Sequence, residues 1–162
     1  MKHQVGLFAG SFDPPTLGHV DLIRRASNLC EMLYVGIATN RSKKLSFTPE
    51  ERQAMLAEVC HDIPHVKVVL IPGLVAEYAK LNHINFLIRG LRSNSDLEFE
   101  MQMACANRKL ENLETVFLLA DPQHAHISSS LIHEIAHGGY RLHGFVPTPI
   151  EDAVYTRITL KL

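Results

Sequence analysis

The chain has 162 residues, 46% of them apolar and 20% charged, a balance typical of a folded globular protein. The formal net charge of −1 argues against a surface built to hold nucleic acid, so any anion site must be a local gathering of cations. The apolar runs are only as long as strands, which predicts neither a signal peptide nor a membrane span. Three widely spaced cysteines, without a C-x-x-C pair, favour reduced thiols in a cytoplasmic protein. We expect a single domain over residues 1–162.

Strand-like and helix-like segments alternate along the whole chain. The β-branched and apolar runs predict strands at Gln4–Ala9, Met32–Ala38, Val66–Ile71, Asn85–Arg89 and Thr115–Ala120. Helical periodicity predicts helices at Gly18–Cys30, Pro49–His61, Val75–Leu81, Asp96–Leu110, Ser128–His137 and about Ile150–Leu160. Thr48 and Glu51 frame Pro49 as a capping box, which marks the start of the second helix. The alternation predicts an α/β fold: a Rossmann-like, doubly wound, five-stranded parallel sheet with helices on both faces.

Ligands of such a sheet bind at the carboxyl ends of the strands. The segments that follow the predicted strands hold several glycines, a run of serines and the potentially cationic residues His19, Lys43, Lys44, Arg89 and Arg92. Like charges gathered at one edge repel one another unless an anion lies among them. Each cation alone has the alternative of an ordinary solvated loop side chain, but the set together predicts an anion site.

The segment between the first strand and the first helix is Gly10–His19, "GSFDPPTLGH". The chain has neither a P-loop nor a G-x-G-x-x-G run, so this segment would bind phosphate in another way. Gly10 allows a close turn after the strand. Gly18 and His19 stand at the helix start, where free backbone N–H groups and the helix dipole favour phosphate. An imidazole there can donate a hydrogen bond to a phosphate oxygen, and the alternative is a helix-start histidine without a role.

Two motifs resemble those of the nucleotidyltransferase superfamily. The segment "GSFDPPTLGH" is similar to its T/H-x-G-H signature, and "ISSS" (Ile127–Ser130) is similar to its I-S-S-[ST] helix start. Within that superfamily, the chain is most similar to the bacterial phosphopantetheine adenylyltransferases. Further matching runs extend the likeness nearly end to end: Ser42–Arg52, Gly73–Ala79, Leu87–Arg108 and Val116–Ala136.

This resemblance implies a reaction between two phosphates. AMP passes from ATP to 4'-phosphopantetheine with Mg²⁺ as cofactor, which gives dephospho-coenzyme A and pyrophosphate in the penultimate step of coenzyme A biosynthesis. The resemblance also implies a homohexamer and feedback inhibition by coenzyme A. The acceptor phosphate is already ionised, so the chemistry needs no general base and no covalent intermediate, and catalysis can rest on positioning and charge stabilisation.

The same resemblance implies roles for individual residues. The implied catalytic residues are His19 at the α-phosphate, Lys43 at the attacking phosphate, and Arg92 and Ser129 at the leaving phosphates. The implied ATP-binding residues are Ser11, Phe12, His19, Gly90, Leu91, Arg92, Glu100, His124, Ser128, Ser129 and Ser130. The residues implied to bind phosphopantetheine are Ser11, Lys43, Leu74, Val75, Arg89, Met103 and Asn107. Ligands for Mg²⁺ are not assigned.

Some of these residues have a plain structural alternative or depart from the family pattern. The alternative for Leu74, Val75 and Met103 is a place in the core, and for Glu100 it is an ordinary exposed helix acid. His124 stands where relatives often carry Trp or Tyr beside the adenine, although an imidazole can also stack.

Another enzyme of the same superfamily is the nearest rival. The run "FDPP" is also similar to the nicotinate mononucleotide adenylyltransferases, but "SKK", "IRGLR" and His133–Glu134 favour the pantetheine branch. A nucleotide-binding regulator without catalysis is a second rival, and it would not need His19, Lys43 and Arg92 together.

A zinc metalloprotease is a more distant rival. His133, Glu134 and His137 match the H-E-x-x-H motif, in which two histidines share one helix face. Tyr140 stands where the longer form of this motif needs glycine, and no methionine follows Met103 to form a Met-turn. We therefore expect an exposed helix end at this run.

Overall fold

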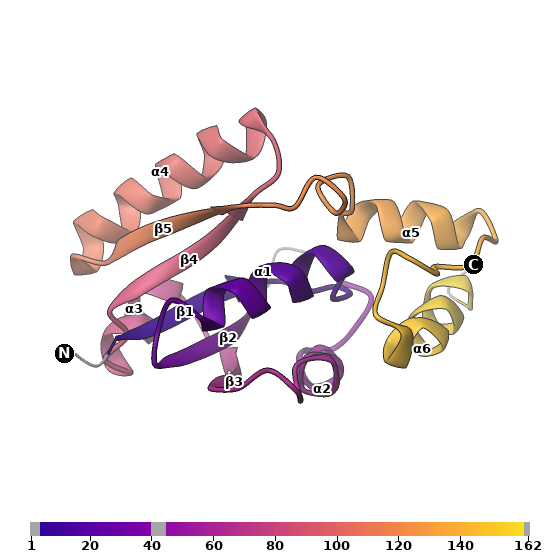
Figure 1. Ribbon diagram of the computed structural model, residues 1–162, viewed down its shortest axis with the longest axis horizontal. Coiled ribbons are helices and arrows are strands. Elements are labelled where there is room, and N and C mark those ends of the chain that lie inside the picture. Colours follow the sequence, from indigo (N-terminus) through magenta and orange to yellow (C-terminus); the bar gives the residue numbers. More distant parts are fainter. Residues whose placement is uncertain (1–3, 40–44, 161–162) are drawn as a thin grey trace.

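A single parallel sheet forms the middle of the molecule (Figure 1). The computed structural model describes residues 4–39 and 45–160. Its strands are β1 (Val5–Gly10), β2 (Met32–Ala38), β3 (Val66–Ile71), β4 (Phe86–Leu91) and β5 (Glu114–Leu119). They are parallel and pair in the order β3-β2-β1-β4-β5, so the chain winds outward from β1 in both directions. The predicted doubly wound α/β fold is confirmed.

Helices alternate with the strands as predicted. They are α1 (Leu17–Ser27), α2 (Pro49–Val59), α3 (Val75–Leu81), α4 (Asn94–Glu111), α5 (Ser129–His137) and α6 (Thr148–Thr159). Some predicted ends differ from the observed ends by a few residues, because capping side chains fix a helix end more sharply than apolar periodicity does. The side chain of Ser93, for example, accepts a hydrogen bond from the Asp96 amide, so α4 begins before its predicted start.

Both faces of the sheet are buried. Phe8, Val35 and Ile88 face the apolar sides of α1 and α2. Leu7 and Leu87 point the other way, toward the small buried side chains of α3. Successive residues of β1 and β4 therefore serve opposite faces, and both are apolar, which is the pattern of buried parallel strands. Each such buried Leu, Ile or Phe contributes about 1.5–3 kcal/mol to the stability of the fold.

The outer helix α4 keeps much apolar surface exposed. Phe99, Met101, Met103 and Leu110 are 60%, 52%, 44% and 60% exposed. Among the side chains that the structure describes on this helix, only that of Glu100 is buried. A helix that packs so loosely leaves room beneath it, and the cavity described below lies there.

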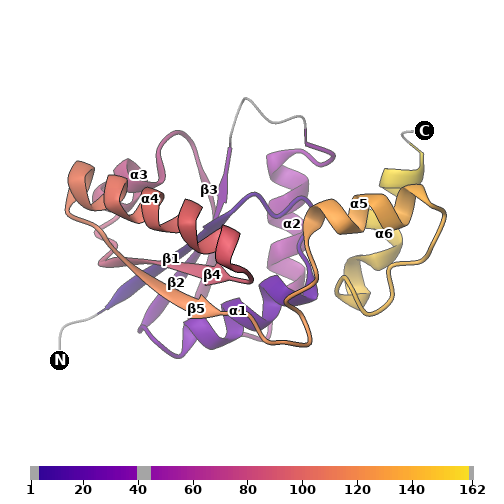
Figure 2. The same cartoon turned by 90° about the horizontal axis from the view of Figure 1, so that it is seen from above.

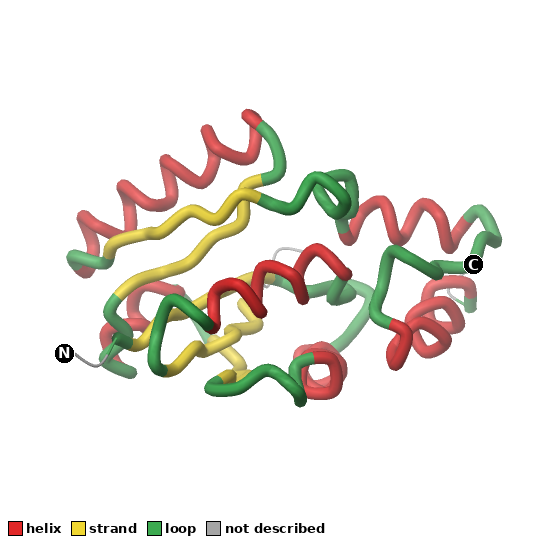
Figure 3. The backbone as a smooth tube through the Cα atoms, in the orientation of Figure 1, coloured by secondary structure: helices red, strands yellow, loops and turns green. Residues whose placement is uncertain are grey.

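Helices α5 and α6 lie together at one end of the molecule, beyond the carboxyl ends of the strands (Figure 2). Arg157 of α6 pairs with Glu51 of α2, which ties this end to the sheet layers. Figure 3 shows the loops that leave the central strands on the side of the sheet nearer to α5. In the part of the chain that the structure describes, no helix is both long enough and apolar enough to cross a membrane.

Candidate active site

The turn between β1 and α1 presents His19 in the first turn of α1. Thr16 caps this helix: its side chain accepts the His19 amide at 3.3 Å, and its own amide donates to Nδ1 of His19 at 3.0 Å. The pair is a capping box in which histidine takes the place that Glu or Gln usually holds. An N–H group can only donate, so Nδ1 is the acceptor and the proton of the neutral ring lies on Nε2.

The imidazole of His19 is uncharged at neutral pH. Burial, with smaller contributions from the charges of Arg92 and Arg89, lowers the pKa of His19 to about 4. The ring makes a T-shaped contact with the buried ring of Phe12, with 5.0 Å between centroids. His19 therefore offers a neutral Nε2–H donor whose orientation is fixed by Thr16 and Phe12.

A buried arginine of α2 holds the same turn. Nη1 of Arg52 donates to the carbonyl oxygen of Ser11 at 2.6 Å, and Arg52 is 1% exposed. Burial lowers the pKa of Arg52, and the charge of Asp13 opposes this effect. The Asp13 carboxylate in turn accepts the amides of Ser46 and Phe47 at 2.9 Å each. These contacts fasten the turn to the segment that leads into α2. No local signal in the sequence marks Arg52 for this role.

Helix α5 also fastens the turn. The serine run Ser128–Ser130 begins this helix, with its first residue as N-cap and its last residue exposed. Ser129 Oγ donates to the carbonyl oxygen of Pro14 at 3.0 Å. One helical turn later, the ring Nε2 of His133 lies 3.0 Å from the carbonyl oxygen of Asp13, to which it donates. The predicted serine run therefore stands at a helix N-terminus beside the turn, where backbone amides favour anions.

The H-E-x-x-H run has a structural explanation here. His133 is hydrogen-bonded to the carbonyl oxygen of Asp13. The ring centroids of His133 and His137 are 6.2 Å apart. Within residues 4–39 and 45–160, no three His, Cys, Asp or Glu side chains gather as ligands for a metal ion. His133 links α5 to the turn that carries His19, and its side chain is only 23% exposed, so the expectation of an exposed helix end is wrong for this residue.

Two arginines near the end of β4 are each paired with a carboxylate of α4. Arg89 donates from Nε and Nη2 to the two oxygens of Glu100, at 2.8 and 2.5 Å. Arg92 donates from Nε to Asp96 at 3.0 Å and from Nη1 to the carbonyl oxygen of Ile127 at 3.4 Å. Asp96 and Glu100 are i and i+4 on α4, so they lie on one face of that helix. The Glu100 side chain is only 11% exposed, so the alternative of an ordinary exposed acid is wrong.

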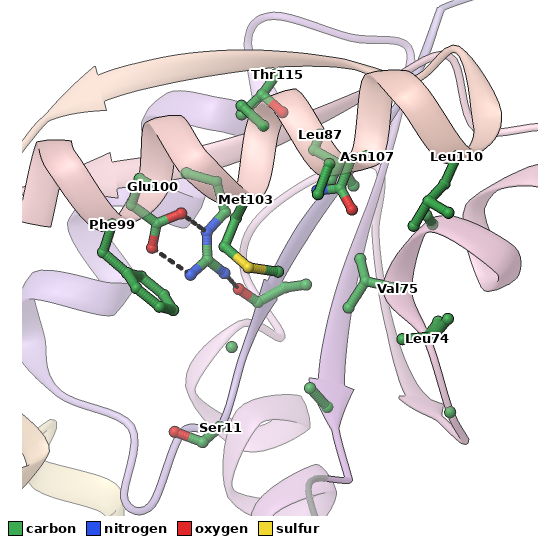
Figure 4. A pocket seen from close by; sticks show the side chains of 18 of the residues that line it. Ser11, Leu74, Val75, Leu87, Phe99, Glu100, Met103, Asn107, Leu110 and Thr115 are labelled. Atoms are coloured by element: carbon green, nitrogen blue, oxygen red, sulfur yellow. Dashed lines mark hydrogen bonds and ion pairs between the residues drawn. The ribbon is translucent and has the colours of Figure 1, made fainter.

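A cavity of about 740 Å³ lies between α4, the start of α3 and the ends of the central strands (Figure 4). The predicted phosphopantetheine-binding residues that the structure describes all line it: Ser11, Leu74, Val75, Arg89, Met103 and Asn107. Leu74 and Met103 are 63% and 44% exposed, so the alternative of a place in the core is wrong for them. Lys43 lies outside the described residues.

The remaining members of the predicted ATP set lie around α1 and the end of β4. A β-carbon on Gly90 would come within 2.4 Å of Cδ1 of Leu22, so the missing side chain leaves room for α1 to pack against β4. Leu91, the next residue, is buried. A β-carbon on Gly18 would lie 3.5 Å from the β-carbon of His124, which places His124 against the start of α1.

The strand-end edge of this sheet thus combines a fixed histidine donor, two arginines and a second helix N-terminus, a site of the nucleotidyltransferase class. The chain belongs to the cytidylyltransferase-like family, whose model matches residues 7–135. A curated relative, the phosphopantetheine adenylyltransferase of Lachnoclostridium phytofermentans, is 44% identical over 155 residues, which make up 95% of each chain. The predicted resemblance to the nucleotidyltransferase superfamily and to this kind of enzyme is confirmed.

Solved structures share the fold at low sequence identity. A proposed nicotinate-nucleotide adenylyltransferase from Vibrio parahaemolyticus has a TM-score of 0.66 at 12% identity, over 93% of this chain and 97% of that one. A lipopolysaccharide core biosynthesis protein from Thermoplasma volcanium has a TM-score of 0.54 at 18% identity, over 73% of this chain and 96% of that one. At these identities the likeness concerns the fold alone.

Proposed function

We propose that the protein transfers AMP from ATP to 4'-phosphopantetheine, with release of pyrophosphate and dephospho-coenzyme A. The observation that carries this proposal is the cavity under α4, which is mostly apolar but holds Ser11 and the Arg89–Glu100 pair. In Figure 4, Ser11 and Glu100 lie toward one end of the cavity, and Leu74 and Leu110 lie toward the other. Such a cavity suits a ligand with a phosphate at one end and a partly apolar arm. The name of the relative from L. phytofermentans supports the same acceptor.

In the proposed reaction, an oxygen of the acceptor phosphate attacks the α-phosphorus of ATP. A bond forms between that oxygen and the α-phosphorus, while the bond from the α-phosphorus to the bridging oxygen breaks and pyrophosphate leaves with that oxygen. Negative charge shifts among the phosphate oxygens during the transfer. His19 donates its Nε2–H to the α-phosphate, where a donor already fixed by Thr16 stabilises this charge without having to reorganise.

The other cations at this edge bind the phosphates on either side of the α-phosphate. Arg89 lines the cavity, so it holds the acceptor phosphate, together with Lys43 as the resemblance implies. Arg92 and the first amides of α5, at Ser129 and Ser130, hold the leaving phosphates. The side chains of Arg92 and its partner Asp96 are 40% and 26% exposed. A phosphate can therefore reach Arg92 from solvent and replace the Asp96 carboxylate as its partner.

Mg²⁺ enters this proposal as part of the Mg²⁺–ATP substrate. Among the described residues there is no group of three potential metal ligands, and the α4 carboxylates Asp96 and Glu100 are both paired with arginines. Mg²⁺ in phosphoryl-transfer sites is often held largely by substrate phosphates and water. The steps proposed above are therefore written through the residues of this chain, and no protein ligand for Mg²⁺ is proposed.

We also propose a cytoplasmic homohexamer that coenzyme A inhibits, as the resemblance implies. Met101 of α4 and Val116 and Leu119 of β5 do not line the cavity, and they are 52%, 39% and 71% exposed. Exposed apolar side chains on an outer helix and an edge strand favour contact with another copy of the chain.

Coenzyme A carries the same pantetheine arm as the acceptor, so it would compete for the same cavity. All three cysteines are free, and free thiols are kept reduced in the cytoplasm.

Product analysis tests the proposed reaction. Protein first treated with a chelator that removes zinc is incubated with ATP, Mg²⁺ and 4'-phosphopantetheine. We expect equal amounts of pyrophosphate, measured by a coupled assay, and dephospho-coenzyme A, measured by mass spectrometry. Pyrophosphate without dephospho-coenzyme A would contradict the proposed acceptor. In a separate assay with a peptide substrate, cleavage that stops when the chelator removes zinc would favour the H-E-x-x-H interpretation.

A further inference from the structure

An ion pair joins helix α3 to the last residue of α4. Nζ of Lys80 lies 2.7 Å from Oε2 of Glu111, and the two side chains are 66% and 23% exposed. Glu111 is the last residue of α4, where the helix dipole disfavours a carboxylate. The stability of α4 by itself therefore does not explain an acid at this position, whereas the contact with Lys80 does.

Little apolar packing holds α3 in place. This helix has seven residues, and its N-cap Leu74 forms no side-chain cap hydrogen bond. Its buried side chains, those of Ala76 and Ala79, are methyl groups, and each buries much less apolar surface than a leucine does. Helices of this length are not stable without tertiary contacts. The side-chain contact between Lys80 and Glu111 is therefore important for where α3 lies relative to α4.

The two helices joined in this way form the walls of the cavity at the end away from Ser11. Leu74 and Val75 come from the start of α3, and Leu110 comes from the last turn of α4. In Figure 4 these side chains lie together at that end, with Leu110 across from Leu74 and Val75. Glu111 directly follows Leu110 in the chain, so the ion pair sets how far the two walls stand apart.

We propose that the α3–α4 ion pair of Lys80 and Glu111 sets the width of the cavity at this end, and so determines how well the far part of the acceptor fits. This inference rests on the proposed function, because it takes the cavity as the acceptor site with the phosphate beside Ser11 and Arg89. The part of 4'-phosphopantetheine most distant from the phosphate is its cysteamine end. The ion pair therefore acts on the cysteamine end and not on the phosphate or on ATP.

A second ion pair at the same end of α4 provides a matched control. Nη2 of Arg108 and Oε2 of Glu114 are 2.5 Å apart, and the side chains are 64% and 60% exposed. Glu114 is the first residue of β5, so this pair joins α4 to the sheet and not to α3. Its loss should leave the distance between α3 and α4 unchanged.

Acceptor kinetics of Glu111→Gln test the proposal, because glutamine keeps the size of the side chain but removes its charge. Loss of an exposed ion pair is a small change, so we expect the KM for 4'-phosphopantetheine to rise about threefold, with kcat and the KM for ATP unchanged. Competition by 4'-phosphopantothenate, which has the same phosphate but no cysteamine end, should be equally strong in wild-type and variant protein. Weaker competition in the variant, or no competition in either protein, would overturn the proposal.

Charge exchange separates the ion pair from other effects of these side chains. Lys80→Glu alone places two carboxylates together and should raise the acceptor KM more than Glu111→Gln does. The double variant Lys80→Glu/Glu111→Lys restores an ion pair and should return the acceptor KM to near the wild-type value. Glu114→Gln should leave this KM unchanged. A double variant as impaired as Lys80→Glu, or an equal rise in Glu114→Gln, would contradict the proposal.

Hydrogen exchange tests the ion pair without any ligand or turnover. The amide of Tyr78 donates to the Leu74 carbonyl at 3.0 Å and that of Asn82 to the Tyr78 carbonyl at 3.1 Å, so both amides report local opening of α3. We expect them to exchange about threefold faster in Glu111→Gln than in wild-type or Glu114→Gln protein. Equal exchange in all three proteins would overturn the role of the ion pair. Wild-type protein that makes no dephospho-coenzyme A would instead contradict the proposed function and leave the exchange result as the test of the ion pair.

Discussion

The backbone amide of Thr16 donates to Nδ1 of His19 at 3.0 Å, and this contact decides which nitrogen of the ring faces a ligand. Nδ1 is occupied as an acceptor, so Nε2 carries the proton and can donate it to a phosphate oxygen. The capping box that starts α1 therefore also sets the tautomer of the residue at the centre of the proposed reaction.

His19→Ala tests the donor role. Because the donor contributes most when charge develops on the α-phosphate, we expect kcat to fall about 10²-fold or more, with the KM for ATP changed only a few-fold. Steady-state assays of pyrophosphate release measure both. His137→Ala, which removes an exposed histidine of α5, is the control and leaves kcat unchanged. A parallel loss of ATP binding would mean that His19 holds the ground state instead.

The lowered pKa of His19 predicts a pH-dependent stability. Folding lowers this pKa from 6.5 to about 4, so between these values the unfolded chain binds more protons than the folded protein does. The free energy of unfolding should be highest above pH 6.5 and fall by about 3 kcal/mol from this group as the pH drops to 4. Urea unfolding of wild-type and His19→Gln protein at pH 7 and pH 4 measures the difference, since glutamine does not titrate. Identical pH dependence in both proteins would refute the assigned pKa.

Arg52 and Arg24 form a matched test of buried and exposed charge. Arg52→Met leaves the Ser11 carbonyl without its donor and the Asp13 charge without a nearby cation in a buried site, so we expect a loss of about 3 kcal/mol or more in the free energy of unfolding. Arg24 pairs with Asp62 on the surface, where the side chains are 52% and 51% exposed, so Arg24→Met should cost less than about 1 kcal/mol. Chemical denaturation measures both, and equal losses would contradict the role given to Arg52.

Two threonines of the cavity wall should respond to valine with opposite signs. Thr115 Oγ1 is buried without a hydrogen-bond partner in the described part of the chain, whereas Thr39 Oγ1 donates to the Ile71 carbonyl at 3.0 Å. Thr115→Val removes an unpaired polar atom and should raise the free energy of unfolding by about 1 kcal/mol, while Thr39→Val should lower it by a similar amount. Denaturation curves of the two variants give the signs directly. A destabilised Thr115→Val protein would show that this hydroxyl has a partner.

Local signals in the sequence were enough to predict the elements and the location of the site. Apolar runs of strand length alternate with helical periodicity, and Thr48 and Glu51 do form the predicted capping box around Pro49. Because parallel strands share one carboxyl edge, the segments after the strands could be placed together without any knowledge of their contacts. The predicted phosphopantetheine set came from the family resemblance, and its described members line one cavity.

Contacts between distant segments could not be predicted in the same way. Arg52 is a charged residue on a helix, and such residues usually face solvent, so nothing local marks it as the buried partner of the Ser11 carbonyl. The pairing of Arg89 with Glu100 depends on how closely α4 lies over β4, which is a matter of tertiary packing. The usual capping box has Glu or Gln at the position that His19 holds, so the sequence pattern does not predict the box around Thr16. The tautomer of His19 therefore follows only from the geometry of its contact with Thr16.

The most direct test of the account compares two acceptors with the same wild-type protein. With ATP and Mg²⁺ held constant, kcat/KM is measured for 4'-phosphopantetheine and for nicotinate mononucleotide. We predict turnover with 4'-phosphopantetheine and at least about 10³-fold less with nicotinate mononucleotide, because the second acceptor has no arm to fill the apolar cavity. Faster turnover with nicotinate mononucleotide would contradict the proposed acceptor and leave the fold and the phosphate site in place.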